Sequence, residues 1–227
     1  MSKTAVAIAS TIAALACATP ALAGDFYVYG SAGQSDFGLG KGNLDGFLNN
    51  GLSNKGVTNL VSSSSVENTD TGYKLGVGYQ FNPYVAVEGA YVDLGKATYS
   101  YNATGTLGGN NGTANATGDV KVSGVNLSVV GILPVSSDFN LFGKVGVLVG
   151  EAKANINGSA SAGAQSVTYN GGGTKSQSAL SYGIGVSYNI TKQISLRAEY
   201  EEFDLKGIAA TGDPKTNLLS VGIGYKF

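Results

Sequence analysis

Apolar and polar residues alternate with a period of two along eight separate segments of the chain. In the last segment every odd position is apolar and every even position is small or polar. Such alternation is typical of a β-strand whose two faces meet different surroundings. Each segment has roughly nine residues, the length that a tilted strand needs to cross a bilayer. The segments are 26–33, 73–81, 84–92, 125–133, 141–149, 182–190, 194–200 and 219–227.

The connections between these segments alternate between short and long. The short ones are 82–83, 134–139 and 191–193, and the long ones are 34–72, 93–124, 150–181 and 201–217. Short turns on the periplasmic rim and long loops on the other rim are the pattern of outer-membrane barrels. We expect strands to extend into the long connections, and mobile tips at the Gly-, Ser- and Asn-rich stretches 62–65, 108–112 and 171–173. Apolar spacing over 44–52 predicts a short surface helix.

Charged residues at membrane depth all fall in one phase of the alternation, opposite to the apolar stripe. They are Lys74, Glu88, Lys144, Arg197, Glu199 and Lys226. A lipid-facing Lys or Arg at mid-depth costs roughly 2–4 kcal/mol, so this phase is predicted to face the lumen. A lipocalin-like soluble barrel would have the opposite arrangement. The charges that are out of phase lie beyond the apolar stripe on the loop side: Asp93, Lys121, Lys153 and Glu202.

The aromatic residues are predicted to form two belts, as rings do at membrane–water interfaces. Near the short-turn rim lie Phe26, Tyr79, Phe81, Tyr188, Tyr225 and Phe227. Near the long-loop rim lie Tyr73, Tyr91, Tyr182 and Tyr200. The terminal Phe227, with Tyr225 and further apolar residues at alternate positions before it, is similar to the C-terminal signature by which bacterial outer-membrane barrels are recognised for assembly.

The first 23 residues have the features of an export signal. Lys3 supplies a positive n-region, residues 5–16 are mostly apolar, and residues 21–23 form an Ala-Leu-Ala cleavage site. Cleavage there predicts a mature barrel over 24–227 without cysteine, since Cys17 is the one cysteine of the chain. A lipoprotein alternative would use Cys17 as the lipidated residue.

Composition narrows the function classes. The formal net charge is −1, and charged residues make up 13% of the chain, where about 25% is usual in soluble domains. There is no basic field for nucleic acid. No apolar run after the signal approaches the ~18 residues of a spanning helix. Low charge without such a helix favours a barrel whose outer wall faces lipid.

Residues 78–84, Gly-Tyr-Gln-Phe-Asn-Pro-Tyr, with Glu88 and then residues 91–95, resemble the second and third strands of the outer membrane protein A transmembrane domain and related small barrels. Arg197 and Glu199-Tyr200 resemble that family's seventh strand. The resemblance covers residues 24–227 and implies an all-β, eight-stranded antiparallel transmembrane barrel in the bacterial outer membrane, with both termini periplasmic. Phe26 replaces the family's usual early Trp, the first loop is unusually long, and the peptidoglycan-binding domain of two-domain members is not expected.

The chain has no histidine, which excludes a His-based catalytic triad or metal site. We therefore expect no enzyme activity, no cofactor and no metal. A carboxylate pair of Glu88 and Glu199 remains conceivable, but pairing with Lys74, Lys144 and Arg197 in a polar lumen is favoured because buried charges are costly alone. Inward glycines either make room for these side chains or leave a water path: Gly76, Gly78, Gly183, Gly185, Gly222 and Gly224.

The sequence thus predicts a non-enzymatic barrel with a structural or adhesion-type role carried by four long surface loops. The alternative is a narrow pore or small-ligand conduit through the lumen. The expected partners are outer-membrane lipid, the barrel assembly machinery, and a host or surface ligand bound through the loops. The sequence does not specify an oligomeric state.

Overall fold

The computed structural model of the chain describes residues 24–205 and 215–227. The predicted export signal and Cys17 lie outside the described residues. The elements are β1 (Asp25–Asp36), α2 (Lys41–Asn54), β2 (Thr58–Glu67), β3 (Thr69–Asn82), β4 (Val85–Leu107), β5 (Asn110–Pro134), β6 (Phe139–Ala162), β7 (Gln165–Asn189), β8 (Ile194–Asp204) and β9 (Lys215–Lys226). Among the described residues no helix is long and apolar enough to span a membrane.

Eight strands form a closed antiparallel ring. Each strand of the ring pairs with its sequence neighbour from β3 to β9, β1 pairs with β3, and the ring closes where β1 pairs with β9 from Tyr27↔Lys226 to Asp36↔Asn217. Closure leaves no free sheet edge at membrane depth, where an unpaired backbone group would cost several kcal/mol. The predicted eight-stranded barrel is confirmed.

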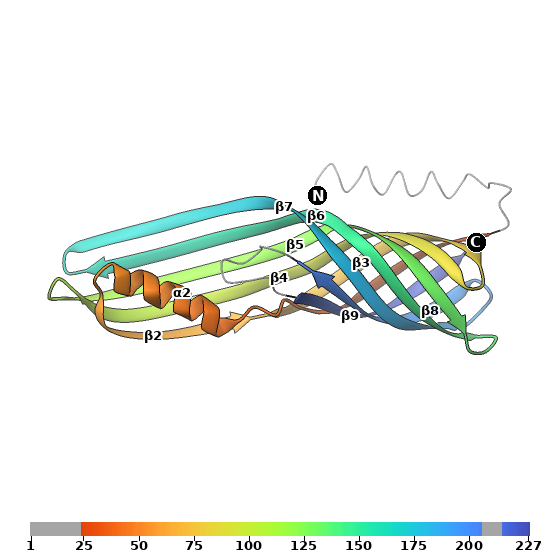
Figure 1. Cartoon of the computed structure of the whole chain (residues 1–227), viewed down its shortest axis with the longest axis horizontal. Helices are drawn as coiled ribbons and strands as arrows, with labels where there is room; N and C mark the ends of the chain where they lie inside the picture. Colours follow the sequence, from red (N-terminus) through yellow and green to blue (C-terminus); the bar gives the residue numbers. More distant parts are fainter. Residues whose placement is uncertain (1–23, 206–214) are drawn as a thin grey trace.

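Four of the strands continue far beyond the ring. The β4–β5 hairpin is paired as far as Leu107↔Asn110 and the β6–β7 hairpin as far as Ala162↔Gln165. Figure 1 shows these hairpins extending to the left of the barrel as a long, nearly flat sheet, to which β2 adds one edge. We call this part, made of β2 and of residues 97–107, 110–121, 152–162 and 165–179, the protruding sheet.

The predicted extension of strands is confirmed, but two of the predicted mobile tips are wrong. Residues 62–65 lie within β2, paired with β4, and residues 171–173 lie within β7, paired with β6. Tertiary pairing with a neighbouring strand satisfies their backbone groups, which outweighs the weak strand propensity of Gly and Ser. Of the three predicted tips, 108–112 alone contains a turn, where Gly108 and Gly109 both have positive φ.

The long first connection holds two elements on the protruding sheet. The predicted helix over 44–52 is confirmed and extends over the whole of α2. Its apolar residues Leu44, Leu48 and Leu52 pack on a cluster built around Tyr99, Tyr101 and Ala103 of β4. Strand β2 has no counterpart among the predicted segments.

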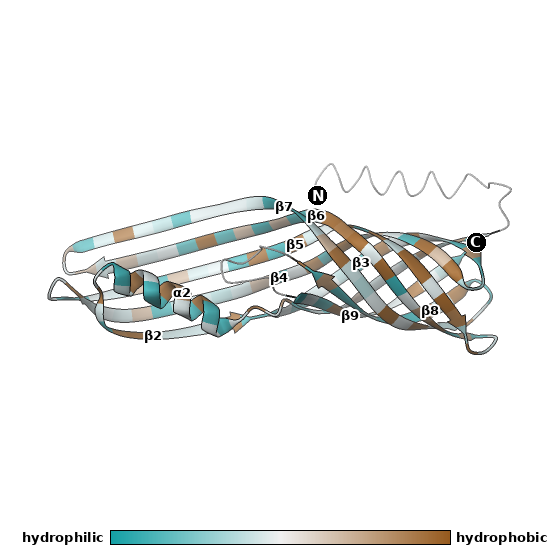
Figure 2. Cartoon of the chain, viewed as in Figure 1, coloured by the Kyte–Doolittle hydropathy of each residue, from teal (hydrophilic) through white to brown (hydrophobic). Residues whose placement is uncertain are grey.

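The barrel wall follows the predicted phase. Apolar side chains that point outward are widely exposed, as in Leu127 (64%), Ile184 (69%) and Val221 (68%). Inward charges such as Lys74 (3%) and Glu88 (4%) are buried. Figure 2 shows the apolar residues concentrated on the barrel, while the protruding sheet is mostly pale or hydrophilic. The short-turn belt is packed, with ring centroids 4.8 Å apart for Phe26–Tyr79 and 5.2 Å for Tyr225–Phe227.

The two faces of the strands exchange their polar and apolar character where the strands leave the barrel. Just beyond the apolar stripe the outward side chains form exposed ion pairs, Lys121–Asp93, Lys153–Glu151 and Lys215–Glu202. The inward side chains there form a buried apolar cluster: Phe37, Val92, Leu94, Val122, Leu148, Phe203, Leu205 and Leu218. We call this cluster the apolar plug. Apolar residues lie inside and charged residues outside, as in a soluble barrel, because the surroundings have changed from lipid to water.

A β-bulge in β4 marks the start of the protruding sheet. The register with β5 shifts between Asp93 and Lys96, and Gly95 within the bulge has φ +74. A side chain at Gly95 would meet Asp70, whose carboxylate accepts the Lys96 N–H at 2.8 Å. The extra residue moves the inward phase of β4 from Val92 to Ala97, so the α2-covered face of the sheet continues the barrel interior.

Candidate functional site

Six charged side chains meet inside the barrel at membrane depth. Lys74 Nζ lies 2.7 Å from Glu199 Oε1 and 2.9 Å from Glu201 Oε2. Lys144 pairs with the same two carboxylates, closely with Glu199 and at 3.0 Å with Glu201. Three carboxylates and three cations balance one another, which satisfies the requirement that buried charges be paired. We call these four residues, together with Glu88 and Arg197, the lumen cluster.

Arg197 links the third carboxylate to the cluster. Its Nη1 lies 2.6 Å from Glu88 Oε1, and its Nη2 lies 3.5 Å from Glu199 Oε2. The guanidinium also lies over the rings of Tyr29 and Phe142, 4.4 and 4.7 Å from their centroids. Arg197 is thus held by ion pairs and by cation–π contacts with two rings.

Neutral polar groups complete the hydrogen bonding of the cluster. The hydroxyls of Tyr27 and Tyr29 donate to Glu88 at 2.8 and 3.1 Å, and Asn126 Nδ2 donates to Glu201 at 2.7 Å. Ser181 Oγ in turn donates to Oδ1 of the Asn126 side chain at 2.9 Å. Glu88 and Glu201 therefore have partners beyond their cations, and such additional hydrogen bonds make a buried ionic network tolerable.

All five residues of the predicted lumen network, Lys74, Glu88, Lys144, Arg197 and Glu199, lie in this cluster. Sequence reasoning missed Glu201, because it assigned residue 201 to a long connection. Strand β8 instead runs to Asp204, so positions 197, 199 and 201 share the inward face. Continuing the two-residue period by one step would have found it. Lys226 is inward in sequence phase but pairs with Asp25 at the short-turn rim.

The inward glycines were predicted to make room for the charged side chains. In the structure they make room chiefly for aromatic rings. A Cβ at Gly76 would lie 2.6 Å from the Tyr29 ring, and one at Gly78 would lie 2.1 Å from the Tyr27 ring. Gly185 has the same relation to Phe142, at 2.3 Å. The rings occupy the space that the missing side chains leave, which favours a filled lumen over a water path.

The lumen contains a vestibule at one end and a packed core at the other. The vestibule has a volume of about 320 Å³, opens at the short-turn end, and is lined at depth by Tyr27, Glu88 and Arg197. Beyond the lumen cluster the apolar plug closes the barrel, with Phe37, Leu94 and Phe203 wholly buried. Both ionic and apolar packing therefore lie between the vestibule and the long-hairpin end.

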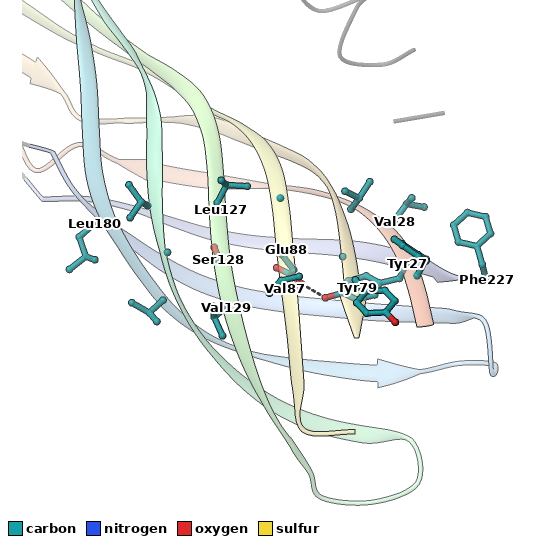
Figure 3. Close-up of a pocket in the computed structure, with 17 residues that line it drawn as sticks. Tyr27, Val28, Tyr79, Val87, Glu88, Leu127, Ser128, Val129, Leu180 and Phe227 are labelled. Atoms are coloured by element: carbon teal, nitrogen blue, oxygen red, sulfur yellow. Dashed lines mark hydrogen bonds between the residues drawn. The ribbon is translucent and has the colours of Figure 1, made fainter. Parts of the chain in front are cut away.

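The outer wall has an apolar depression of about 670 Å³ over β1 and β3–β7. Figure 3 shows its outward side chains, among them Val28, Leu127 and Phe227, and marks the Tyr27–Glu88 hydrogen bond with a dashed line. Since these outward residues belong to the lipid-facing stripe, the depression suits acyl chains of the bilayer.

The carboxylate of Asp45 links helix α2 to the protruding sheet by hydrogen bonds. Asp45 accepts hydrogen bonds from Lys41 Nζ and Tyr99 at 2.7 Å and from Ser64 at 2.5 Å. These partners, Lys41 foremost, hold the pKa of Asp45 at about 2, below its ordinary value of 3.8. Burial, together with the Asp45 carboxylate, raises the pKa of Tyr99. Asn49 of the same helix accepts a hydrogen bond from Tyr101 at 2.5 Å.

The two faces of the protruding sheet differ in chemistry. The α2-covered face has small and apolar residues, with a groove of about 690 Å³ beside the helix lined by Leu52, Ala114, Ala160 and Val167. Paired residues share a face, so the opposite face is a nearly uncharged array of hydroxyls and amides. It comprises Ser63, Ser65, Ser100, Asn102, Thr104, Thr113, Asn115, Thr117, Asn155, Asn157, Ser159, Ser161, Ser166, Thr168, Asn170 and Thr174.

Comparison with known proteins assigns the family. The family described as outer membrane protein beta-barrel domain matches residues 5–227. The chain belongs to this family. It is similar to outer membrane protein A of Shigella flexneri, with 31% identity over 239 residues, and of Salmonella typhi, with 30% over 234 residues. Each alignment covers 100% of the chain and 56% of the relative, so the chain spans about half the length of these relatives.

Solved structures of outer-membrane proteins are similar to the chain at low sequence identity. The outer membrane protein OprG of Pseudomonas aeruginosa has a TM-score of 0.47 and 14% identity, with 90% of this chain and 96% of that chain covered. Ail, the attachment invasion locus protein of Yersinia pestis, has a TM-score of 0.43 and 17% identity, with 90% and 98% covered. The chain is an outer-membrane β-barrel protein of the outer membrane protein A type, and its location is the bacterial outer membrane.

The described residues contain no group of three or more His, Cys, Asp or Glu side chains able to hold a metal ion. The lumen cluster pairs each carboxylate with cations at ion-pair distance, so Glu88 and Glu199 are fixed as counter-charges. The absence of enzyme activity stays a prediction.

Proposed function

We propose that this barrel acts at the cell surface by binding a host or environmental ligand through its protruding sheet. The observation that carries the proposal is the contrast between the two ends of the molecule. The barrel interior is filled by the lumen cluster and the apolar plug, whereas the protruding sheet exposes a large surface to solvent.

The short turns are proposed to face the periplasm and the protruding sheet the cell exterior. Polar, solvent-exposed hairpins of this length are typical of the extracellular side of outer-membrane barrels. The strands of the protruding sheet are continuous with those of the barrel, which positions a binding surface well away from the membrane.

The functional test pairs a binding measurement with a conductance measurement. Cells producing the chain should adhere to at least one member of a panel of purified matrix proteins and glycans. A variant with both long hairpins shortened to the barrel rim, by removing residues 98–119 and 154–173, should lose that adhesion while retaining the heat-modifiable gel mobility of a folded barrel. Equal adhesion by the two proteins contradicts the proposal.

The alternative, a narrow pore, predicts steady single-channel conductance of the refolded protein in a planar bilayer. The proposal predicts none, because ions would have to displace both the lumen cluster and the apolar plug. Steady conductance in the wild type would therefore favour the conduit.

Tyr225 and Phe227 are proposed to be the signal that the barrel assembly machinery recognises. Both rings are exposed on the lipid-facing side of the chain end, 41% and 60%, and they pack edge to face on one another. Deletion of Phe227 should lower the amount of folded barrel in the outer membrane of cells, while refolding in detergent proceeds as in the wild type. Equal loss in both settings would indicate a purely structural role.

A further inference from the structure

The protruding sheet ends on two strand edges, and they are protected to different degrees. Strand β2 is short, its pairing with β4 is shifted between Thr58 and Val61, and Asn59 has φ 51. Such irregularity is a known means of preventing edge-to-edge association. Helix α2 also packs against β2.

The other edge belongs to β7 and has none of these protections. Its pairing with β6 runs without a register shift from Ala162↔Gln165 to Phe139↔Tyr188. Pairing with β8 begins only at Leu180↔Asp204, so among the described residues no strand pairs with the outer side of 165–174. This stretch contains no charged residue and no proline, the two residue kinds that commonly protect an edge. We call it the β7 edge.

We infer that the β7 edge pairs with the β7 edge of a second copy of this chain held in a facing membrane. The inference rests on the proposed function in that the protruding sheet is the interacting part, and it adds a second partner beside the host or environmental ligand. A row of unpaired backbone donors and acceptors binds best to another such row, and the edge is too polar and uncharged to suggest a lipid or ionic partner.

Symmetry decides against pairing within one membrane. Copies in one membrane point the same way, so their β7 edges would run parallel, with identical residues level across a two-fold axis along the membrane normal. In a parallel ladder, one of two residues at the same level directs its backbone N–H and C=O groups toward the other strand, and its counterpart directs them away. Two identical edges at the same level do not meet this requirement unless one strand is shifted by one residue. The same rotation would also join the hydroxyl–amide face of one copy to the α2-covered face of the other.

Copies in facing membranes meet none of these obstacles. They are related by a two-fold axis perpendicular to the sheet, which makes the edges antiparallel and joins like faces. Hydrogen-bonding positions then meet hydrogen-bonding positions, and the contact closes as a dimer.

The side chains select a register centred on Thr168. In that register Thr168 lies opposite itself, and Val167 of each copy lies opposite Tyr169 of the other. Threonine pairs and aromatic–β-branched pairs are favourable cross-strand neighbours. Val167 and Tyr169 are 64% and 62% exposed, so both are available. About twelve residues separate Thr168 from the barrel rim at Leu180, so two such sheets hold the membranes up to roughly 80 Å apart.

The test uses refolded protein in phosphatidylcholine vesicles that contain no other protein. We expect wild-type vesicles to aggregate, as followed by light scattering. Thr168→Lys places two like charges opposite one another and should abolish aggregation. Asn157→Lys adds the same charge to the same face of the sheet on β6, away from the edge, and should leave aggregation unchanged. Aggregation of Thr168→Lys vesicles at the wild-type rate overturns the inference.

Disulfide cross-linking tests the register and the direction. The chain from Gly24 on has no native cysteine, so a single Thr168→Cys should form a dimer between two differently labelled vesicle populations under mild oxidation. Thr174→Cys, predicted to lie beyond the paired stretch, should not. Dimers that form only within one population overturn the facing-membrane geometry. If vesicles do not aggregate in any experiment, the wild type included, while cells still adhere to the ligand panel, this inference is rejected and the proposed function stands.

Discussion

Glu201 and Glu202 are adjacent in the chain but lie on opposite faces of β8. Glu201 is wholly buried and joins both lysines of the lumen cluster, whereas Glu202 forms its ion pair with Lys215 at 2.7 Å on the outside. The chemistry of the two side chains is identical. Their energetic roles differ because one carboxylate is desolvated and the other remains in contact with water.

This pair gives a matched test at residue scale. Glu201→Ala should destabilise the barrel by roughly 3–5 kcal/mol, because Lys74 and Lys144 would then compete chiefly for Glu199. Glu202→Ala should cost less than about 1 kcal/mol, as exposed pairs do. Urea unfolding in lipid vesicles measures both free energies. Similar small losses for the two variants would mean that the lumen is hydrated and not tightly paired.

At the scale of the element, one strand serves in two different solvents. Strand β6 presents Val145, Val147 and Val149 outward at membrane depth, then Lys153, Asn155 and Asn157 outward on the protruding sheet. Its inward residues change in the opposite sense, from Lys144 to Leu148 and Ala152. The two-residue period is continuous, and only the polarity assigned to each face reverses.

The reversal predicts how β6 tolerates charge on its outer face. Val147→Arg should hinder insertion by roughly 2–4 kcal/mol, since Val147 faces lipid. Asn157→Arg, on the same strand and the same face but beyond the membrane, should be nearly neutral. Refolding titrations into vesicles compare the two variants directly. Equal insertion of the two arginine variants would show that the membrane boundary does not lie between these two positions of β6.

Helix α2 depends on an ionised Asp45. Because the pKa of Asp45 is lowered to about 2 when the helix is packed on the sheet, ionised Asp45 stabilises that packing fully above about pH 4. The stabilisation should be lost as the pH falls from about 4 to about 2. Pepsin, which is active in acid, should then cut within 44–52 increasingly fast in the wild type. Asp45→Asn should remove this pH dependence, and an unchanged profile in that variant would exclude Asp45 as its cause.

At the scale of the whole molecule, the orientation of the barrel follows from its two unlike ends. Peptide tags inserted at the turns Gly109 and Gly163, at the tips of the long hairpins, should be reached by antibody on intact cells. A tag at Ser136, in a short turn, should be reached only after permeabilisation. Surface labelling at Ser136 would reverse the orientation. Gly172 is unsuitable for a tag because it lies inside β7, paired with Asn155.

The sequence by itself determined the membrane-spanning part of this protein. Alternation over some nine residues, charges in one phase and aromatic rings at both rims all follow from a single requirement, that lipid accept only apolar side chains. That requirement acts on every residue locally, so it is visible without knowing which strands are neighbours. It located the eight strands, their inward charges and the pairing of those charges inside the lumen.

The tertiary structure alone decided what lies beyond the membrane. In water both polar and apolar residues are tolerated outward, so the period-two signal fades among Ser, Thr, Asn and Gly, and strand pairing becomes a matter of contact with a neighbouring strand. The bulge at Gly95 then moves the inward phase by one residue. For these reasons the protruding sheet and the apolar plug required the folded chain.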